Sequence, residues 1–238
     1  MVYRLVLLRH AESLGNKEDR ITGWNDVDLS ERGIAEAREA GRTLKEAGFT
    51  FDVAYTSLLR RAIKTVWFVL DEMDLHWIPI VKTWRLNERH FGRIEGMRKS
   101  ELAEKYPVGS ATSWRRQNNV SPPKLDKDNP KYLREDPRYS HLKEDEFPNG
   151  ESRHDMVRRV EPYWQQTIIP EIQSGKKVLI VSHGDLIRTL TMVIAHANIE
   201  EAASIAVIPT ATAIIYELDS QMNPIKQEYL DRPSITPR

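Results

Sequence analysis

The sequence has no cysteine, no net charge and no long hydrophobic run. The absence of cysteine excludes disulfides, thiolate metal sites and a cysteine nucleophile. Because nucleic-acid-binding domains usually carry a basic excess, the balance of 35 basic against 35 acidic residues argues against such a partner. No run approaches the roughly 18 apolar residues of a membrane span, and residues 1–8 lack the length and cleavage pattern of a signal peptide. We therefore expect a cytoplasmic protein with no nucleic-acid or membrane partner.

The 238 residues are 40% hydrophobic, which is enough to form the core of a single domain spanning residues 1–238. Short apolar runs predict buried strands at Val2–Leu8, Phe51–Tyr55, Ile78–Val81, Lys177–Val181 and Ala213–Leu218. Periodic apolar residues between them predict helices over Ser30–Gly48, Leu58–Met73, Ser152–Gln173 and Leu186–Ala197. Pro162 is expected to bend the third of these helices. Strands that alternate with helices indicate an α/β fold, a doubly wound and mostly parallel sheet with helices on both faces.

The stretch from Ser121 to Gly150 interrupts this rhythm, because it is rich in proline and charge and has little apolar periodicity. We interpret it as a long ordered loop, or lid, inserted at about residues 121–150. Loops of this length in compact domains are usually functional or disordered. A domain linker is the alternative, although neither flank has the pattern of a complete domain.

Two histidines follow buried strands in matching positions. His10 follows the run LVLLR, and His183 follows the run VLIVS. Ligands of open α/β sheets bind outside the carboxyl ends of the strands, so both rings would face one pocket if the two strands are neighbours. Histidine titrates near neutral pH and offers an uncharged ring nitrogen as a nucleophile. One ring could therefore accept a phosphoryl group while the other stabilises charge on its oxygens.

Basic residues in the predicted loops could hold such an anion, because guanidinium groups match phosphate oxygens and a helix start adds N–H donors. The candidates are Arg61, Arg85, Arg89, Lys99, Arg115 and Arg116. Phosphoryl transfer also needs a proton donor, and Glu88 is the candidate because a buried carboxyl near phosphate would have a raised pKa. For each of these residues the alternative is an ordinary solvated side chain or surface ion pair.

A series of motifs extends along the chain: LRHAES, TGWNDVDLSERG, TSLLRRAIKT, WRLNERHFG, WRR, FPNGES, VLIVSHG and ELD. With these motifs the sequence, from Leu5 to about Gln227, resembles the cofactor-dependent phosphoglycerate mutases of the histidine phosphatase superfamily. The resemblance implies interconversion of 3-phosphoglycerate and 2-phosphoglycerate, in glycolysis and gluconeogenesis, through a phosphohistidine primed by 2,3-bisphosphoglycerate. It also implies a small phosphorylated substrate, no metal, and a homo-oligomer that is a dimer or a tetramer.

The resemblance also implies the roles of individual residues. His10 would carry the phosphoryl group, with Arg9, Arg61 and His183 completing the phosphate pocket and Glu88 acting as acid and base. Substrate or primer would be held by Ser13, Asn16, Thr22, Gly23, Arg89, His90, Phe91, Lys99, Arg115, Arg116, Gly184 and Asp185. The family usually has asparagine where this chain has Asp185, and an ionised carboxylate cannot donate to phosphate and repels it.

Other positions also depart from the family pattern, namely Ala11, Gly15 and Arg93, together with a short C-terminal tail. An open site would let water reach the phosphohistidine, so a phosphomonoesterase acting through the same intermediate is the first alternative. The second is a binding protein that keeps the fold and has lost turnover. The third is a metal hydrolase with ligands His10, His90, His183 and Asp185, although these lack the spacing of HExxH-type sites.

Overall fold

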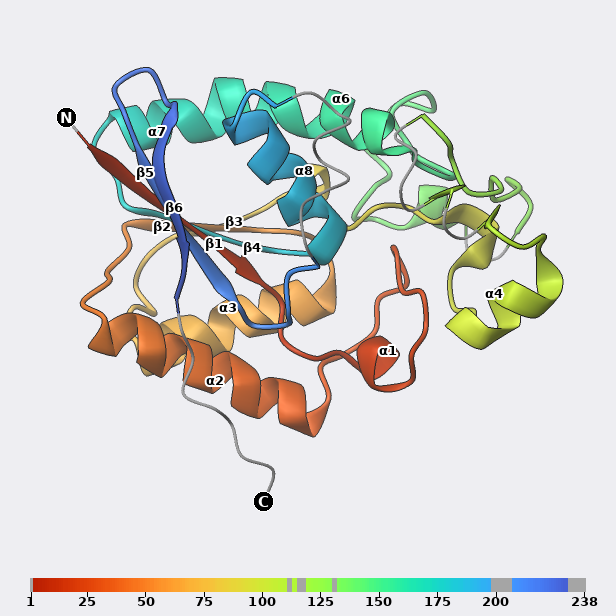
Figure 1. Cartoon of the computed structure of the whole chain (residues 1–238), viewed down its shortest axis with the longest axis horizontal. Helices are drawn as coiled ribbons and strands as arrows, with labels where there is room; N and C mark the ends of the chain where they lie inside the picture. The colour runs from red at the N-terminus through yellow and green to blue at the C-terminus, as the bar shows by residue number, and fades with distance from the viewer. Residues whose placement is uncertain (1, 111–112, 115–118, 130–131, 198–206, 231–238) are drawn as a thin grey trace.

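A mixed sheet forms the centre of the protein (Figure 1). The structure is a computed structural model that describes residues 2–110, 113–114, 119–129, 132–197 and 207–230. Its six-stranded sheet has the order β3-β2-β4-β1-β5-β6. The strands are β1 (Tyr3–Arg9), β2 (Val53–Thr56), β3 (Ile80–Lys82), β4 (Val178–Ser182), β5 (Ala213–Leu218) and β6 (Pro224–Tyr229). Strands β3, β2, β4 and β1 are parallel, and β5 and β6 are antiparallel additions at one side. The predicted α/β fold with a mostly parallel sheet is confirmed.

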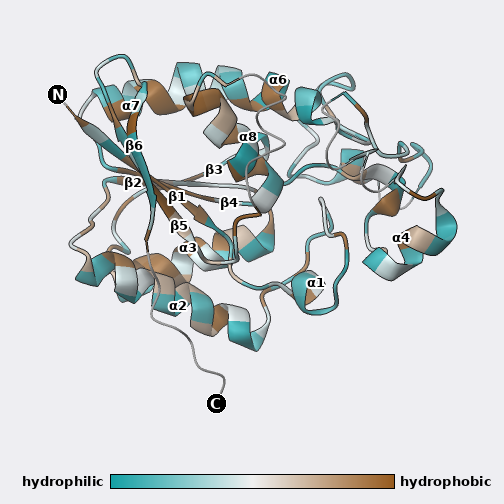
Figure 2. Cartoon of the chain, viewed as in Figure 1, coloured by the Kyte–Doolittle hydropathy of each residue, from teal (hydrophilic) through white to brown (hydrophobic). Residues whose placement is uncertain are grey.

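Helices cover both faces of this sheet (Figure 1). Helices α2 (Glu31–Glu46) and α3 (Arg60–Glu72) lie on one face, and α6 (Arg153–Tyr163), α7 (Ile169–Gln173) and α8 (Gly184–Ile194) lie on the other. Strand β1 is buried from both sides, because Val6 and Leu8 pack with α2 and α3 while Leu5 and Leu7 pack with α6 to α8. Figure 2 shows the hydrophobic strands enclosed between the helices, whose outer surfaces are largely hydrophilic.

Local sequence signals set the ends of the helices. The Ser30 hydroxyl accepts a hydrogen bond from the Gly33 N–H and so caps α2. Gly48 follows the end of this helix with a φ of +76°, a conformation that glycine adopts without strain. Pro162 lies inside α6 and is followed by a π-helical turn over Trp164–Ile168. Because proline has no N–H, the regular hydrogen-bond ladder is interrupted there, as the sequence predicts.

The described part of the insertion at residues 121–150 is ordered around its own apolar cluster. Tyr139, Leu142 and Phe147 are buried against Trp24 and Trp84, and the Tyr139 ring lies 4.9 Å from that of Trp24. None of the described residues of the insertion lines the cavity that contains His10 and Arg61. The described part of this loop covers the Trp24 side of the protein and not the cavity, so the interpretation of the insertion as a lid stays a prediction.

Several short elements were not predicted from the sequence. Strand β6 is exposed along nearly its whole length and lacks an apolar pattern, and helix α4 (Lys99–Lys105) buries only Leu102. Two tryptophans, Trp67 and Trp77, are exposed, whereas Leu75 belongs to the core. The homo-oligomer stays a prediction. Among the described helices, none has the length and apolar character needed to span a bilayer.

Candidate active site

The two histidines predicted to share a pocket lie side by side. In the β1–β4 pair, Arg9 is opposite Ser182, so His10 and His183 leave adjacent parallel strands at the same edge of the sheet. The His10 N–H donates to the Ser182 carbonyl over 2.7 Å, which extends the ladder by one residue. The two ring centroids are 5.0 Å apart, and the ring planes are tilted by 58°. The expectation that the two strands are neighbours is confirmed.

His10 has the properties of a neutral nucleophile. Its Nδ1 lies 2.7 Å from the carbonyl oxygen of Ala11. A carbonyl can only accept, so Nδ1 carries the proton and Nε2 keeps its lone pair. Burial, followed by the positive charges of Arg61 and Arg9, holds the pKa of His10 well below its usual value. The ring is therefore uncharged at neutral pH and can attack phosphorus through Nε2.

His183 is held by a partner that the sequence did not reveal. Its Nε2 lies 2.8 Å from the hydroxyl of Ser57. Ser57 directly follows β2 and is fully buried. Its Nδ1 is also buried and has no hydrogen-bond partner among the described residues. Burial, together with the charge of Arg61, keeps the pKa of His183 well below its usual value. Ser57 thus fixes the ring beside His10.

Two arginines, the buried Arg61 and the partly buried Arg9, supply positive charge at this end of the cavity. Arg61 donates to the carbonyls of Asn25 and Gly23 over 3.0 and 2.8 Å, and Arg9 donates to the carbonyl of Ile208. Burial lowers the pKa of Arg61 to about 10, so it still carries its charge at neutral pH. The Nε of each arginine is buried without a partner among the described residues. These N–H groups are available for an anion.

The start of helix α8 completes the cationic end. Its first residue is Gly184, and His183 occupies the N-cap. A Cβ at Gly184 would lie 3.4 Å from the Arg9 guanidinium, so glycine lets this arginine pack closely on the helix start. A helix N-terminus attracts anions through its unpaired N–H groups and its dipole. The inner end of the cavity is therefore suited to a phosphoryl group.

Glu88 lies at the wall of the cavity on a tightly held loop. Its backbone carbonyl accepts hydrogen bonds from Trp24 Nε1 over 2.6 Å and from Arg159 Nη2 over 3.0 Å. Burial, and then the negative charge of Asp185, raises the pKa of the Glu88 carboxyl above its usual value. A carboxyl with a raised pKa keeps its proton closer to neutral pH, so it can act as a general acid.

A buried ion pair holds the Glu88 loop in place. Arg159 Nε lies 2.6 Å from Glu151 Oε1, and both side chains are buried. The same guanidinium donates to the backbone carbonyls of Arg85, Asn87 and Glu88. We expect Arg159→Met to leave the Glu151 carboxylate without its partner and to lower the free energy of unfolding by about 3–5 kcal/mol. Urea denaturation of this variant tests the expectation.

The control for this variant is the neighbouring Arg158→Met. The Arg158 side chain is 71% exposed and pairs only with Asp155 at 3.7 Å. Exposed ion pairs contribute about 0–1 kcal/mol, so this variant should unfold almost like the parent. Equal unfolding of the two variants would show that Arg159 does not hold the loop.

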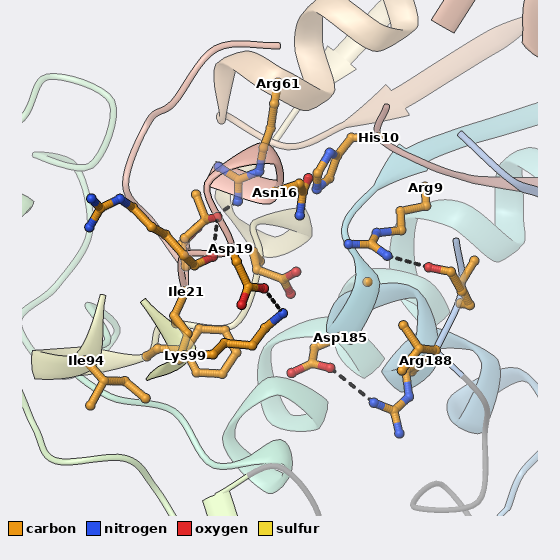
Figure 3. A pocket seen from close by; sticks show the side chains of 18 of the residues that line it. Arg9, His10, Asn16, Asp19, Ile21, Arg61, Ile94, Lys99, Asp185 and Arg188 are labelled. Carbon is orange, nitrogen blue, oxygen red and sulfur yellow. Dashed lines mark hydrogen bonds and ion pairs between the residues drawn. The ribbon is translucent and has the colours of Figure 1, made fainter. Parts of the chain in front are cut away.

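The two arginines, His10, Glu88 and Gly184 all line one cavity of about 360 Å³ (Figure 3). Of the residues predicted from the sequence, the structure brings to its lining Arg9, His10, Asn16, Thr22, Gly23, Arg61, Glu88, Phe91, Lys99, Gly184 and Asp185. His183 lies directly behind His10. Residues that the sequence did not predict also line it: Asp19, Arg20, Ile21, Ile94, Leu102, Trp114, Arg188, Val207 and Ile208. Arg115, Arg116 and the tail from residue 231 fall outside the described residues.

The family profile of the histidine phosphatase superfamily (branch 1) matches residues 5–135 and 125–228. The chain belongs to this superfamily. Its fold is also similar to that of a mycobacterial glucosyl-3-phosphoglycerate phosphatase, with 22% identity and a TM-score of 0.73 over 96% of this chain and 97% of that one. A putative α-ribazole-5′-phosphate phosphatase from Escherichia coli shares 22% identity with a TM-score of 0.73 over 99% of both chains. The Bacillus stearothermophilus protein YhfR shares 26% identity with a TM-score of 0.69 over 91% of both chains.

Three residues expected to hold substrate in this member of the superfamily do not line the cavity. Arg89 is buried and donates to the carbonyls of Glu151, Trp114 and Val120. His90 accepts the Gly92 N–H at its Nδ1 and is also buried. Ser13 forms a capping box with Asn16 at the short helix α1 (Leu14–Lys17). These side chains shape the walls, and the Asn16 Oδ1 is engaged by the cap, which leaves its amide nitrogen to donate toward a ligand.

Two positions that depart from the family pattern, Gly15 and Arg93, have defined contacts in the structure. A Cβ at Gly15 would lie only 2.6 Å from the Thr22 hydroxyl, so Thr22 fills the space beside this glycine. Gly15 therefore supports the loop that carries Thr22 and does not loosen it. Arg93 pairs with Asp126 at 2.6 Å and is not part of the cavity lining. It neither blocks the cavity nor offers a further anion site there.

The structure does not assemble the ligand set considered for a metal hydrolase. His10 Nδ1 is bonded to a backbone carbonyl, and His90 lies outside the cavity lining. Within the described ranges, no three side chains of histidine, aspartate or glutamate are placed to hold a metal ion.

Asp185 adjusts the proton affinity of Glu88 in this member of the histidine phosphatase superfamily. It lies in the first turn of α8, pairs with Arg188 at 3.3 Å, and its charge raises the pKa of Glu88. We expect Asp185→Asn to lower that pKa. Because Glu88 must be protonated to act as an acid, activity should then begin to fall at a lower pH on the alkaline side. The dependence of kcat on pH measures this shift, with the exposed Asp71→Asn on α3 as control. An unchanged alkaline limb contradicts the assignment.

Proposed function

We propose that the protein is a phosphomonoesterase that works through a phosphorylated His10. The observation that carries the proposal is the pairing of an uncharged His10, whose Nε2 is unprotonated, with a Glu88 carboxyl of raised pKa at the same cationic end of the cavity. One group can take the phosphoryl moiety, and the other can protonate the leaving oxygen. Two of the similar structures carry the names of phosphatases, which supports hydrolysis as the outcome.

In the first step, His10 Nε2 attacks the phosphorus atom of the substrate. The P–N bond forms as the bond from phosphorus to the ester oxygen breaks. Glu88 gives its proton to that oxygen, so the product leaves as a neutral alcohol. Arg9, Arg61 and the start of α8 stabilise the negative charge on the transferring group.

In the second step, a water molecule attacks the phosphohistidine. Glu88, now a carboxylate, takes one proton from this water while the P–O bond forms and the P–N bond breaks. Inorganic phosphate leaves, Glu88 is again protonated and His10 is again neutral. The proton of His10 stays on Nδ1 throughout, where it is donated to the Ala11 carbonyl.

A 2,3-bisphosphoglycerate-primed phosphoglycerate mutase is the second candidate, supported by the motif WRLNERHFG and by Lys99 in the lining. A mutase must also retain a second anionic group, the other phosphate or the carboxylate. The described residues fit this less well than they fit one phosphoryl group, because Lys99 is paired with Asp19 and Arg188 with Asp185. The inner end of the lining would hold one phosphate of the primer.

A primed mutase assay with phosphate release followed in parallel separates the candidates. We expect phosphate release from simple phosphomonoesters without primer, and a phosphoryl adduct on His10 detectable by intact mass. Formation of 2-phosphoglycerate only when primer is added, with no phosphate released, would favour the mutase. Ligand binding with neither turnover nor adduct would favour a non-enzymatic protein.

A further inference from the structure

The cavity has an apolar wall in the part away from His10 and Arg61, which we call the outer half and which also holds Lys99 and Arg188. Ile94, Leu102 and Trp114 form a buried cluster, and Ile21 and Phe91 pack against it. All five also line the cavity, so one side of this cluster faces the ligand space. Trp114 is held from behind by Tyr106, whose ring stands nearly perpendicular to it at 5.0 Å between centroids. The wall is therefore a supported surface of the cavity.

The described cations of the outer half are already paired. Lys99 pairs with Asp19, Arg188 pairs with Asp185 at 3.3 Å, and Arg20 pairs with Glu18 at 2.7 Å. Figure 3 shows the first two pairs on different sides of the cavity. Arg9, His10 and Arg61 lie above them in this view. An anionic group on the substrate would have to displace one of these carboxylates or lie beside it. An apolar group would bury surface against the wall without disturbing either pair.

We infer that the outer half selects phosphomonoesters whose leaving group is uncharged and apolar, such as an aromatic alcohol, over phosphorylated carboxylic acids. The inference rests on the proposed phosphatase function and specifies its substrate class. The phosphoryl group occupies the cationic end at His10, and the alcohol portion extends along Ile21, Leu102 and Trp114. The wall is a set of specificity-determining side chains and takes no part in the bond-breaking steps.

Benzyl phosphate and 3-phosphoglycerate test this preference, because both release an alkyl alcohol and therefore need similar help from Glu88. We expect kcat/KM for phosphate release to be at least about tenfold higher for benzyl phosphate, the size of effect that a matched apolar pocket gives. A higher value for 3-phosphoglycerate overturns the inference while leaving the phosphatase function in place. If none of the three substrates (benzyl phosphate, methyl phosphate and 3-phosphoglycerate) releases phosphate, both the inference and the proposed phosphatase function are overturned.

Variants of the wall provide the second arm. The ratio of kcat/KM for benzyl phosphate to that for methyl phosphate should fall about tenfold in Trp114→Ala, since methyl phosphate is too small to reach the wall. Ile21→Thr, which keeps the branching at Cβ but replaces the ethyl group with a hydroxyl, should lower the same ratio if Trp114→Ala does not fold. The matched control is Trp77→Ala, which removes a tryptophan that is 74% exposed. A ratio unchanged in both wall variants overturns the inference.

Asp19→Asn tests the paired charges. Asp19 has a φ of +54°, a conformation that asparagine also tolerates, so the backbone should be preserved. With its partner neutralised, Lys99 becomes available to a substrate carboxylate. We expect kcat/KM for 3-phosphoglycerate to rise several-fold relative to that for benzyl phosphate. A relative fall for 3-phosphoglycerate would show that the pair does not discriminate against acids, and would overturn this part of the inference.

Discussion

Replacing His10 with alanine is expected to lower the rate of phosphate release by about 10⁴-fold or more, the usual cost of removing a nucleophile. The neighbouring His183 is not expected to substitute for it, because its ring is fully buried, lies outside the cavity lining and is held at Nε2 by Ser57. The variant should also lose the phosphoryl adduct that intact-mass measurement detects after acid-free quenching. Loss of the adduct together with activity distinguishes covalent catalysis from simple binding of phosphate by the ring.

A matched control for this variant is His76→Ala. His76 is an exposed histidine that pairs with Asp71 at 2.8 Å and is not part of the cavity lining. It should retain full activity and the same adduct. If the His10 variant keeps a phosphoryl adduct at another residue, the assignment of the nucleophile is wrong even if its rate is reduced.

Glu88→Gln is expected to lower kcat for alkyl phosphates by about 10²–10⁴-fold, the usual contribution of a general acid. Glutamine has the same shape but no proton to transfer, so the cost should depend on the leaving group. For p-nitrophenyl phosphate, whose alcohol leaves readily as an anion, the loss of rate in the first step, measured as the burst of p-nitrophenolate, should be much smaller. Rates measured with the two kinds of substrate therefore separate proton transfer from a loss of structure.

The pH dependence gives an independent measurement on the same residue. Because burial and Asp185 raise the pKa of Glu88, the protein should be active below that pKa and lose activity as the pH rises through it. This alkaline limb should disappear in Glu88→Gln. Glu161→Gln, at an exposed position of α6, is the control. An alkaline limb that survives in Glu88→Gln would assign it to another group.

The sequence predicts the sheet and the two histidines well, because both depend on short local signals. Apolar runs identify the central strands, and the residue that follows each strand is known once its end is known. The topology rule for parallel sheets then places His10 and His183 at one edge. Strand β6 lacks such a signal, since it lies at the edge of the sheet and its side chains are exposed.

The contacts that hold the site could not be predicted in the same way. Ser57 and His183 are separated by 126 residues, and Arg159 reaches the carbonyls of a loop more than 70 residues before it. Such pairs depend on the tertiary structure, and a serine or arginine in these positions has no distinctive pattern. Arg89 and His90 show the opposite case, because their residue types suit a phosphate but their side chains point into the protein around the loop.

The hydrogen bond from the His10 N–H to the Ser182 carbonyl has a consequence for how the protein loses activity. The distance between the two imidazoles depends on the main-chain ladder of β1 and β4, whose residues are buried on both faces of the sheet. Fluctuations that open surface loops leave this ladder closed, so its amide protons should exchange with solvent only when the whole domain unfolds. Inactivation in urea should then coincide with the loss of overall structure, and the catalytic pair should be among the last features to separate.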